Sequence, residues 1–413
     1  MRLELPTPGA GTGLNGLHLT YCTNIHPGDG WPAVDANIRR YAPPLKARLS
    51  PSQPFGLGLR LSAREARELR TGTALAEFRA WLDDQGLYVA LINGFPYGPF
   101  HGTPVKAEVY APDWRTAERL DYTLDLIHIL ERLLPAGLHG GVSTAPLTYK
   151  AWMRAGDPDA LATMSANVAR VAVALRRARD ERGVRVHLDI EPEPDCLLET
   201  TTETIGFFER SLLPRGGAHV RDALGLSAAE AEAALLEHVQ VCFDCCHFAV
   251  EYEDPAVALQ RLAAAGLRVG RVQLSSAIDV TVPPAEAATV CDRLRPFADS
   301  TYLHQVIERR AGQLHHYPDL GDALDSSADT SREWRIHFHV PLFAADYDGL
   351  GSTQAYVTRV LELALRAPFT THLEIETYTW DVLPGGLKID LGESIRREYE
   401  WVLSTISAVA PGR

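Results

Sequence analysis

Short runs of apolar and β-branched residues alternate along the chain with longer segments whose apolar positions recur at helical spacing. The runs predict eight strands, at residues 17–23, 55–61, 88–93, 140–144, 184–190, 239–243, 269–274 and 372–375. Strands that alternate with helices are typical of repeated βα units around a parallel sheet. We therefore expect an α/β protein made of a single (β/α)8 TIM barrel, with a core covering about residues 17–410 of one domain.

Helix signals between the strands support this alternation. Ser62 with Glu65, and Ser227 with Glu230, fit capping boxes, in which side chain and backbone satisfy each other's hydrogen bonds at a helix start. An apolar stripe precedes Gly183, which is expected to end its helix. These segments predict helices that lay an apolar face on the sheet.

Two features depart from simple alternation. Strand-like runs at 302–308 and 336–340, with a turn signal within 309–316, predict a hairpin-like insertion between the seventh and eighth core strands, at about residues 278–345. A long loop at 94–115 follows the third strand and is rich in Gly, Pro and aromatic residues. Insertions and long loops at the C-terminal face of a barrel commonly build active sites. The loop aromatics either stack on a ligand or pin the loop to the barrel mouth.

Carboxylates stand where three predicted strands end. Alternation along the strands points Glu191, Asp244 and Glu376 toward the barrel interior, with His247 just beyond Asp244. Acidic groups that converge raise one another's pKa unless a cation neutralises them. Oxygen ligands with an imidazole suit a divalent ion such as Mn²⁺, Zn²⁺, Fe²⁺, Co²⁺ or Mg²⁺. The alternative is that each carboxylate caps a loop or pairs with an arginine.

The sequence leaves four candidates for the remaining ligand of the metal ion: Gln273, His304, His337 and His339. Of these we select His339 as the metal ligand, because its strand lies next to the last one in sequence and presents this imidazole near the apparent strand end. His337 and His339 would lie on one face of that strand. That pair could equally line a solvated cavity. Glu191, Glu376 and His247 are the expected catalytic residues. The expected substrate contacts are His247, Gln273, His304, His337, Asn93, Tyr97 and Lys106.

The net charge of the chain limits the classes of molecule that it is expected to bind. The chain of 413 residues carries 40 Lys and Arg against 53 Asp and Glu, a formal charge of −13, which argues against nucleic acid as a partner. Its first residues lack the apolar core of a signal peptide, and no apolar run is long enough for a membrane span. We expect a cytoplasmic protein with a small-molecule ligand; the oligomeric state is open.

Six cysteines occur, three of them close together as Cys242, Cys245 and Cys246. In a long chain without an export signal we expect them to be reduced and buried. A Cys-x-x-Cys pair can bind zinc, but neither a second pair nor a nearby His pair completes a structural site in the sequence.

The chain resembles a known family at several motifs. Glu191-Pro, Asp244-x-x-His247 and Glu376 resemble the xylose-isomerase-like TIM-barrel superfamily of sugar and sugar-phosphate isomerases and epimerases. More closely, five segments resemble the EboE "metabolite traffic" family: 19–28 (LTYCTNIHPG), 93–97 (NGFPY), 110–115 (YAPDWR), 187–194 (HLDIEPEP) and 335–343 (RIHFHVPLF).

The resemblance implies a metal bound by Glu191, Asp244 and Glu376, with His247 contacting substrate or metal. The superfamily's usual His on the seventh strand is Gln273 here. The leading hypothesis is a divalent-metal-dependent isomerase or epimerase acting on a sugar, polyol or sugar phosphate, linked to secondary-metabolite biosynthesis or traffic. A barrel that binds or carries a metabolite without catalysis is the alternative, and a metal-dependent hydrolase comes third.

Overall fold

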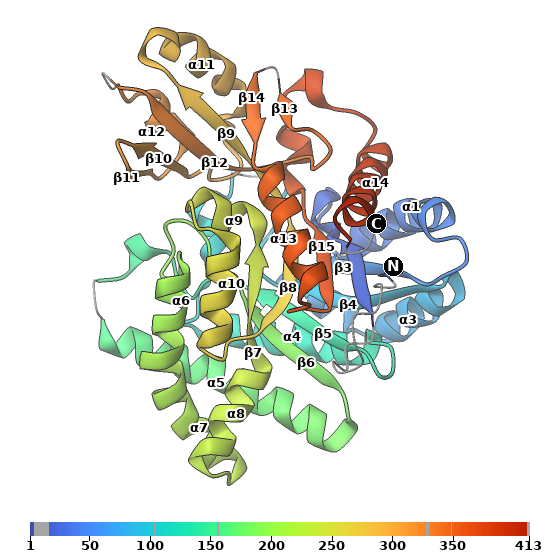
Figure 1. The fold of residues 1–413 in the computed structure, drawn as a ribbon. Coiled ribbons are helices and arrows are strands. Elements are labelled where there is room, and N and C mark those ends of the chain that lie inside the picture. The colour runs from blue at the N-terminus through green and yellow to red at the C-terminus, as the bar shows by residue number, and fades with distance from the viewer. Residues whose placement is uncertain (4–15, 103, 155–156, 328–329, 348, 411–413) are drawn as a thin grey trace.

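The computed structural model describes residues 1–3, 16–102, 104–154, 157–327, 330–347 and 349–410. They form a parallel barrel and a second, antiparallel sheet that stands at one end of it (Figure 1). None of the helices in these ranges is long and apolar enough to span a membrane.

The barrel strands follow chain order around the sheet and pair in parallel. A bridge between Cys22 and Gly58 brings the first strand to the second and closes the ring. A short antiparallel strand, β1 (Arg2–Leu3), extends the first. All eight predicted strands are confirmed: β2 (Leu17–Tyr21), β3 (Phe55–Arg60), β4 (Leu87–Asn93), β5 (His139–Thr144), β6 (Arg185–Ile190), β7 (Val239–Asp244), β8 (Val269–Leu274) and β15 (His372–Ile375).

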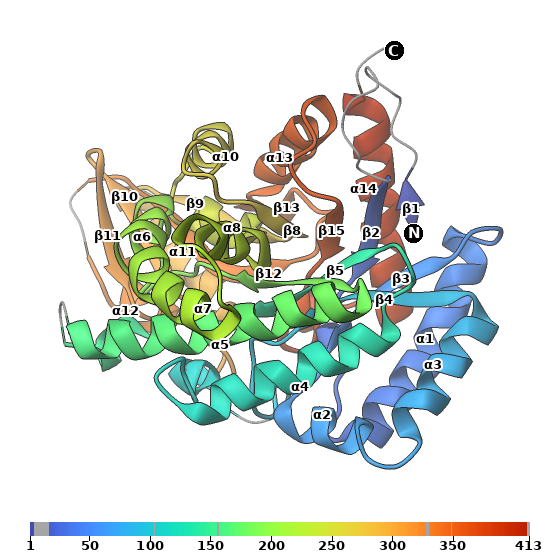
Figure 2. The ribbon, with the colours of Figure 1, turned by 90° about the horizontal axis from the view of Figure 1, so that it is seen from below.

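Helices cover the outside of the barrel (Figure 2). The capping boxes of Ser62 and Ser227 are confirmed, and Gly183 takes the left-handed conformation that ends its helix. The helices are α1 (Trp31–Leu49), α2 (Ala63–Leu69), α3 (Ala74–Gln85), α4 (Ala117–Leu133), α5 (Pro158–Arg182), α6 (Thr201–Phe207), η4 (Phe208–Gly216), α7 (Gly217–Leu224), α8 (Ala228–His238), α9 (Cys245–Val250), α10 (Pro255–Ala264), α13 (Gln354–Arg366) and α14 (Leu391–Val409).

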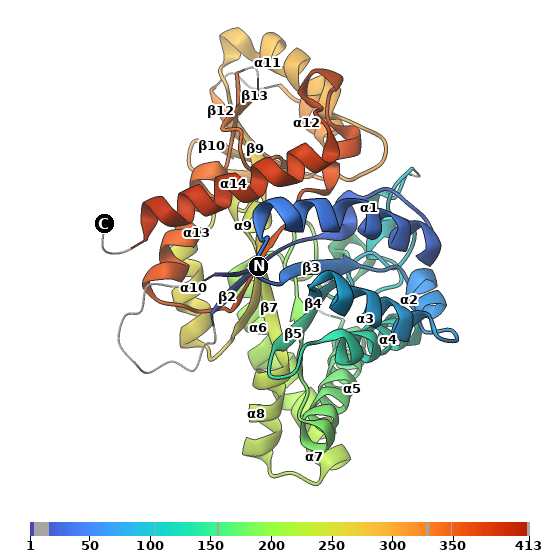
Figure 3. The same ribbon diagram turned by 90° about the vertical axis from the view of Figure 1, so that its right-hand side faces the viewer.

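The insertion is a sheet of six strands rather than a hairpin alone. Its order is β11-β10-β12-β9-β14-β13, and its helices α11 and α12 complete a separate apolar core around Trp334 and Phe338. Figure 3 shows this unit beyond α14, which packs beside α1 and α13. The elements are β9 (Ser276–Val282), α11 (Ala287–Leu294), β10 (Val306–Arg310), β11 (Gln313–Tyr317), α12 (Leu320–Leu324), β12 (Arg332–Val340), β13 (Asp346–Tyr347) and β14 (Leu350–Ser352).

Short 3-10 segments shape the loops above the barrel. Two of them line the mouth, η2 (Lys106–Tyr110) in the long loop after β4 and η7 (Tyr378–Val382) after β15. The others are η1 (Thr23–Ile25), η3 (Lys150–Trp152), η5 (Pro284–Glu286), η6 (Arg295–Phe297) and η8 (Gly385–Leu387).

A buried ion network occupies the barrel interior. Arg271 on β8 donates to Asp189 Oδ2 at 3.0 Å and to Glu374 Oε2 at 3.1 Å, and all three side chains are fully buried. Its other nitrogen donates to the backbone carbonyls of Ile92 and Gly141. These bonds tie four strands to one guanidinium, which compensates two carboxylates that water cannot reach.

Replacing Arg271 with Met should lower the free energy of unfolding by about 3–5 kcal/mol, because Asp189 and Glu374 would stay buried without their cation. Urea denaturation followed by circular dichroism measures this loss. Arg268→Met is a matched control at an exposed position next to the same strand and should change stability by less than about 0.5 kcal/mol. Equal stability of the two variants would contradict the assignment.

A second ion cluster ties the inserted sheet to the barrel. His316 Nδ1 on β11 lies 3.2 Å from Glu199 Oε1 and 3.7 Å from Asp195 Oδ1, in the loop after β6. Hydrogen bonds to Asp195 and Glu199 raise the pKa of His316 to about 10. Lys150 also pairs with Glu199, so the carboxylates hold two cations at this junction.

His316→Gln should therefore destabilise the protein in a pH-dependent way. A raised folded-state pKa means that the stabilisation is complete below the ordinary pKa of 6.5 and is lost as pH rises to about 10. The difference in urea midpoint between wild type and variant should shrink over this range. A difference that is constant or grows with pH would show that charge on His316 does not stabilise the junction.

Candidate metal centre

The structure places the three predicted carboxylates at the C-terminal rim of the barrel. Glu191 follows β6, Asp244 ends β7 and Glu376 follows β15, and none of them is more than 4% exposed. β8 carries Gln273 between them, fully buried. The strand ends thus deliver these groups to one place, as alternation along the strands predicts.

Gln273 joins two of the carboxylates. One atom of its side-chain amide lies 2.8 Å from Glu191 Oε1 and 3.0 Å from Asp244 Oδ2. With its nitrogen there, Gln273 donates to both carboxylates and all of its polar atoms are satisfied, so this orientation is the one that fits. Asp244 Oδ1 accepts from Ser275 Oγ and from the His247 backbone, so Oδ2 is left for this point.

Electrostatics at this rim follow from burial. Desolvation raises the pKa of Glu191 well above its usual value, and the neighbouring Asp244 and Glu376 raise it further. Burial also raises the pKa of Glu193 to about 8, although Tyr110 opposes this by donating to Glu193 Oε1 at 2.8 Å. The repulsion expected from the sequence is therefore present, and a bound cation would relieve it.

Glu376 has polar partners on both sides. Asn24 Nδ2 donates to Glu376 Oε1 at 2.5 Å, and His339 Nδ1 lies 2.7 Å from Glu376 Oε2 and 3.0 Å from its backbone oxygen. Since a backbone oxygen only accepts, His339 Nδ1 carries a hydrogen. Although burial opposes it, neighbouring Cys246, Glu376 and Asp244 raise the pKa of His339 well above its usual value, so without a bound ion its Nε2 carries a hydrogen as well. His339 therefore orients Glu376 with one nitrogen, and the other becomes a ligand atom when a cation displaces its proton.

Two further imidazoles are oriented in the same manner. His247 donates from Nδ1 to the backbone oxygen of Pro192 at 2.9 Å, and its ring centroid lies 4.6 Å from that of His337. Burial, with His247 and His339 nearby, lowers the pKa of His337 well below its usual value, so this ring is neutral. A metal-binding His usually donates its other nitrogen to a fixed acceptor, and these rings have that arrangement.

Glu191, Glu376 and the three imidazoles face a cavity with a free volume of about 50 Å³, enough for a few ordered water molecules or a small polar group. The loop after β4 forms much of its wall, as the sequence predicts, and contributes Tyr110 with several apolar residues. The lining residues are Asn24, Asn93, Phe95, Pro96, Phe100, Val105, Lys106, Val109, Tyr110, Glu191, Glu193, His247, Tyr302, Leu303, His337, His339, Glu376 and Tyr378.

Comparison with solved structures identifies the architecture. A xylose isomerase-like TIM barrel protein from Mycobacterium smegmatis, in complex with magnesium, matches with a TM-score of 0.50 and 12% identity over 95% of this chain and 97% of that one. The fold is that of a TIM barrel. At this identity the similarity establishes the fold alone.

Two other solved structures match less well. The probable 3-DHS dehydratase AsbF from Bacillus anthracis, described as involved in petrobactin synthesis, has a TM-score of 0.44 and 12% identity over 94% of this chain and 99% of its own. The IOLI protein with a bound zinc atom has a TM-score of 0.48 and 11% identity, over 96% of this chain and 100% of that chain. No family model matches the chain, and no curated protein matches it.

Other predicted substrate residues of this barrel take different places. Asn93 lines the cavity, and so does Lys106, whose Nζ donates to Asp319 Oδ2 at 2.6 Å. Tyr97 lies outside the lining, with its ring edge-on to that of Tyr122 at 5.2 Å. His304 also lies outside it: its Nδ1 is 2.9 Å from the His337 backbone oxygen, and its Nε2 contacts Asp299.

Glu193, Tyr378 and Asn24 are among the lining residues that were not selected from the sequence. Glu193 stands two positions after Glu191, so strand alternation applied one step further would have found it. Tyr378 follows Glu376 in the same way. Asn24 had a weaker signal, because it lies in η1 just beyond the end of the first strand.

Proposed function

We propose that this barrel is a divalent-metal-dependent isomerase or epimerase of small polyhydroxylated carbonyl compounds. The observation that carries the proposal is that Glu191, Asp244 and Glu376 are buried at one rim of the barrel, where Glu191 and Glu376 also line a cavity. Buried carboxylates are stable together when a cation neutralises them. The xylose isomerase-like fold is compatible with this chemistry, and the EboE-like motifs link it, as part of the same proposal, to metabolite traffic.

The donors predicted for a divalent ion are the carboxylates of Glu191, Asp244 and Glu376 and the imidazole of His339. Among the described residues, Asp244 and His339 belong with His247 to a group whose possible ligand atoms lie within 4.8 Å of one another. The choice among Mn²⁺, Zn²⁺, Fe²⁺, Co²⁺ and Mg²⁺ stays open, since these ligands suit all of them. When bound, such an ion would polarise a carbonyl or hydroxyl oxygen of the substrate.

Proton movement is assigned to the chain's own residues. His247 Nε2 presents a lone pair at the cavity and lies 3.9 Å from Asp244 Oδ1, so it can take a proton from a carbon next to a carbonyl and return it. Glu193, held by Tyr110, is a second group at the cavity able to hold a proton. The aromatic walls exclude water, and Asn93 and Lys106 provide polar contacts for hydroxyl or phosphate groups.

Glu376→Gln should reduce turnover by a factor of about 10² or more, because the variant lacks one carboxylate charge of the site. Proton NMR of candidate sugars and sugar phosphates in deuterated water measures exchange at carbon. Glu362→Gln, on the outer helix α13, is the control and should keep full activity. Full activity of a folded Glu376→Gln variant would contradict the assignment.

Metal content provides an independent test. The wild type, purified gently, should hold a near-stoichiometric divalent ion at the carboxylates, and Glu191→Gln and Asp244→Asn should each lose it while retaining the wild-type circular dichroism. Elemental analysis per chain measures this. A wild type that binds no ion after reconstitution would overturn the metal-dependent function.

A metabolite-binding barrel without catalysis is the second candidate. It is favoured by Gln273, whose amide can neutralise the contact between Glu191 and Asp244 by donating to both. The same deuterium experiment separates the two candidates. A ligand that binds tightly and shows no exchange at carbon would favour binding alone.

A further inference from the structure

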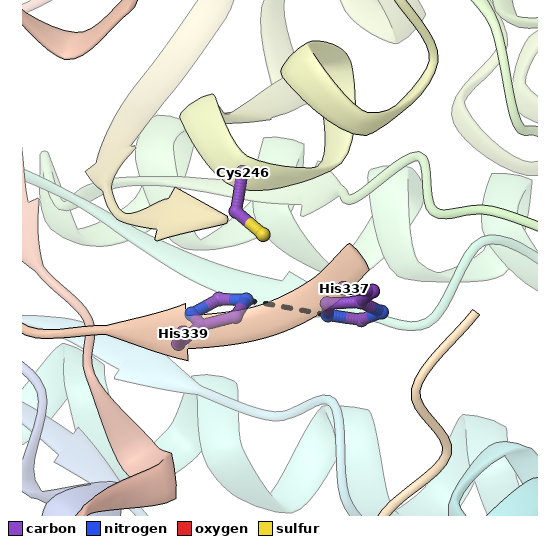
Figure 4. Close-up of side chains that lie close together, drawn as sticks. All are labelled: Cys246, His337 and His339. Atoms are coloured by element: carbon purple, nitrogen blue, oxygen red, sulfur yellow. Dashed lines mark hydrogen bonds between the residues drawn. The ribbon is translucent and has the colours of Figure 1, made fainter. Parts of the chain in front are cut away.

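A thiol and two imidazoles converge where the inserted sheet meets the barrel. Cys246 lies in the first turn of α9, and its Sγ points toward His337 and His339 on β12 (Figure 4). One possible ligand atom from each residue lies within 4.8 Å of the other two. The three residues are 0%, 2% and 1% exposed, so water does not compensate their polar atoms.

His337 is held in one tautomer by its neighbours. Gln305 Nε2 donates to Tyr110 Oη at 3.0 Å and to the Pro194 backbone oxygen at 3.1 Å, which fixes the amide with its oxygen on the other side. That oxygen lies 2.7 Å from His337 Nδ1 and accepts its hydrogen. His337 Nε2 is therefore left with a lone pair.

His339 Nδ1 donates to the backbone oxygen of Glu376, so its Nε2 is the nitrogen turned toward His337. The two Nε2 atoms lie 3.3 Å apart and face each other. At this spacing either a proton on His339 Nε2 or a cation must lie between them, and a metal ion would take the place of that proton. Two zinc–nitrogen bonds of about 2.0–2.1 Å at a tetrahedral angle place their nitrogens about 3.3–3.4 Å apart, so the observed spacing fits a shared metal ion.

We propose that Cys246, His337 and His339 bind a thiophilic divalent transition-metal ion, with Zn²⁺ as the fitting example. This site adjoins the oxygen-rich site of Glu191, Asp244 and Glu376, because His339 contacts Glu376 and also lies within 4.8 Å of Asp244. It stands on the contacts of its own residues and does not depend on the proposed reaction. It assigns His339, predicted as a ligand for the carboxylate-bound ion, to a different ion through its Nε2.

Ligand chemistry separates the two sites. One sulfur and two imidazole nitrogens select Zn²⁺ or Co²⁺ over Mg²⁺, which prefers oxygen. Three protein ligands leave a fourth position open, the pattern of zinc sites that bind water or substrate rather than purely structural ones. Because His337 and His339 line the cavity, a ligand oxygen could occupy that position.

The sequence could not identify this site. Its cysteine cluster lacked a neighbouring His pair, and the pair is supplied instead by a strand of the insertion, distant along the chain but adjacent in the fold. His337 and His339 also come close to carboxylates, in the groups Glu193–His247–His337 and Asp244–His247–His339. The competing arrangement is a metal ion bound by one of these two groups, with no sulfur ligand.

Cobalt spectroscopy on the full chain decides between them. The protein, stripped with a chelator and titrated with Co²⁺ under reducing conditions, should show sulfur-to-cobalt charge-transfer absorption in the near ultraviolet. Cys246→Ser should abolish this absorption and weaken Zn²⁺ binding by about 10-fold or more. Cys291→Ser, a buried thiol in the core of the inserted sheet, is the matched control and should leave both unchanged.

Three outcomes would overturn the proposal: no charge-transfer absorption in the wild type, the same absorption in Cys246→Ser, or its loss in Cys291→Ser alone. If Cys246→Ser does not fold, X-ray absorption of the zinc-loaded wild type decides, through the presence or absence of a zinc–sulfur distance of about 2.3 Å.

Glu191→Gln separates this proposal from the proposed function. It should remove carbon–deuterium exchange while leaving the cobalt–sulfur absorption in place. Exchange activity in a protein without that absorption would support the isomerase and reject the sulfur site, and the reverse result would do the opposite.

Discussion

The guanidinium of Arg271 is the interaction on which the barrel depends. A barrel this polar inside cannot rely on apolar packing alone, and one cation reaches Asp189, Glu374 and two backbone carbonyls. The network needs room, and glycines supply it: a side chain at Gly58 would collide with Glu374, and one at Gly270 with Asp189. Because Arg271 fixes the carboxylates of Asp189 and Glu374, the strands can hold Glu191, Asp244 and Glu376 in place at the rim above them.

Most of the barrel could be predicted because its strands are short apolar runs, and the helices between them begin and end at recognisable capping residues. Ser62 and Gly183 mark helix ends by local chemistry, which does not require tertiary contacts. The inserted sheet was underestimated for physical reasons. β13 and β14 are too short to show a period, and β9 begins after a single residue, Ser275, beyond β8, so no turn separates the two.

The candidate site also has one part that could be predicted from the sequence and one part that could not. Alternation in β6, β7 and β15 was enough to bring Glu191, Asp244 and Glu376 to one rim. The contacts of Tyr97 and His304 could not be read in this way, because they depend on how loops and the insertion pack on the barrel. The contact between Cys246 and β12 could not be predicted either, because no periodicity in the sequence relates these two segments.

The continuity of β8 into β9 has a consequence for how this pocket can change over evolutionary time. The oxygen donors belong to barrel strands, while His337 and His339 arrive with the inserted sheet. A relative that lost the insertion would keep the carboxylates and give up both imidazoles in one genetic event. The pocket thus has two parts: its carboxylates and Cys246 are inherited with the barrel, and His337 and His339 can be gained or lost together with the insertion.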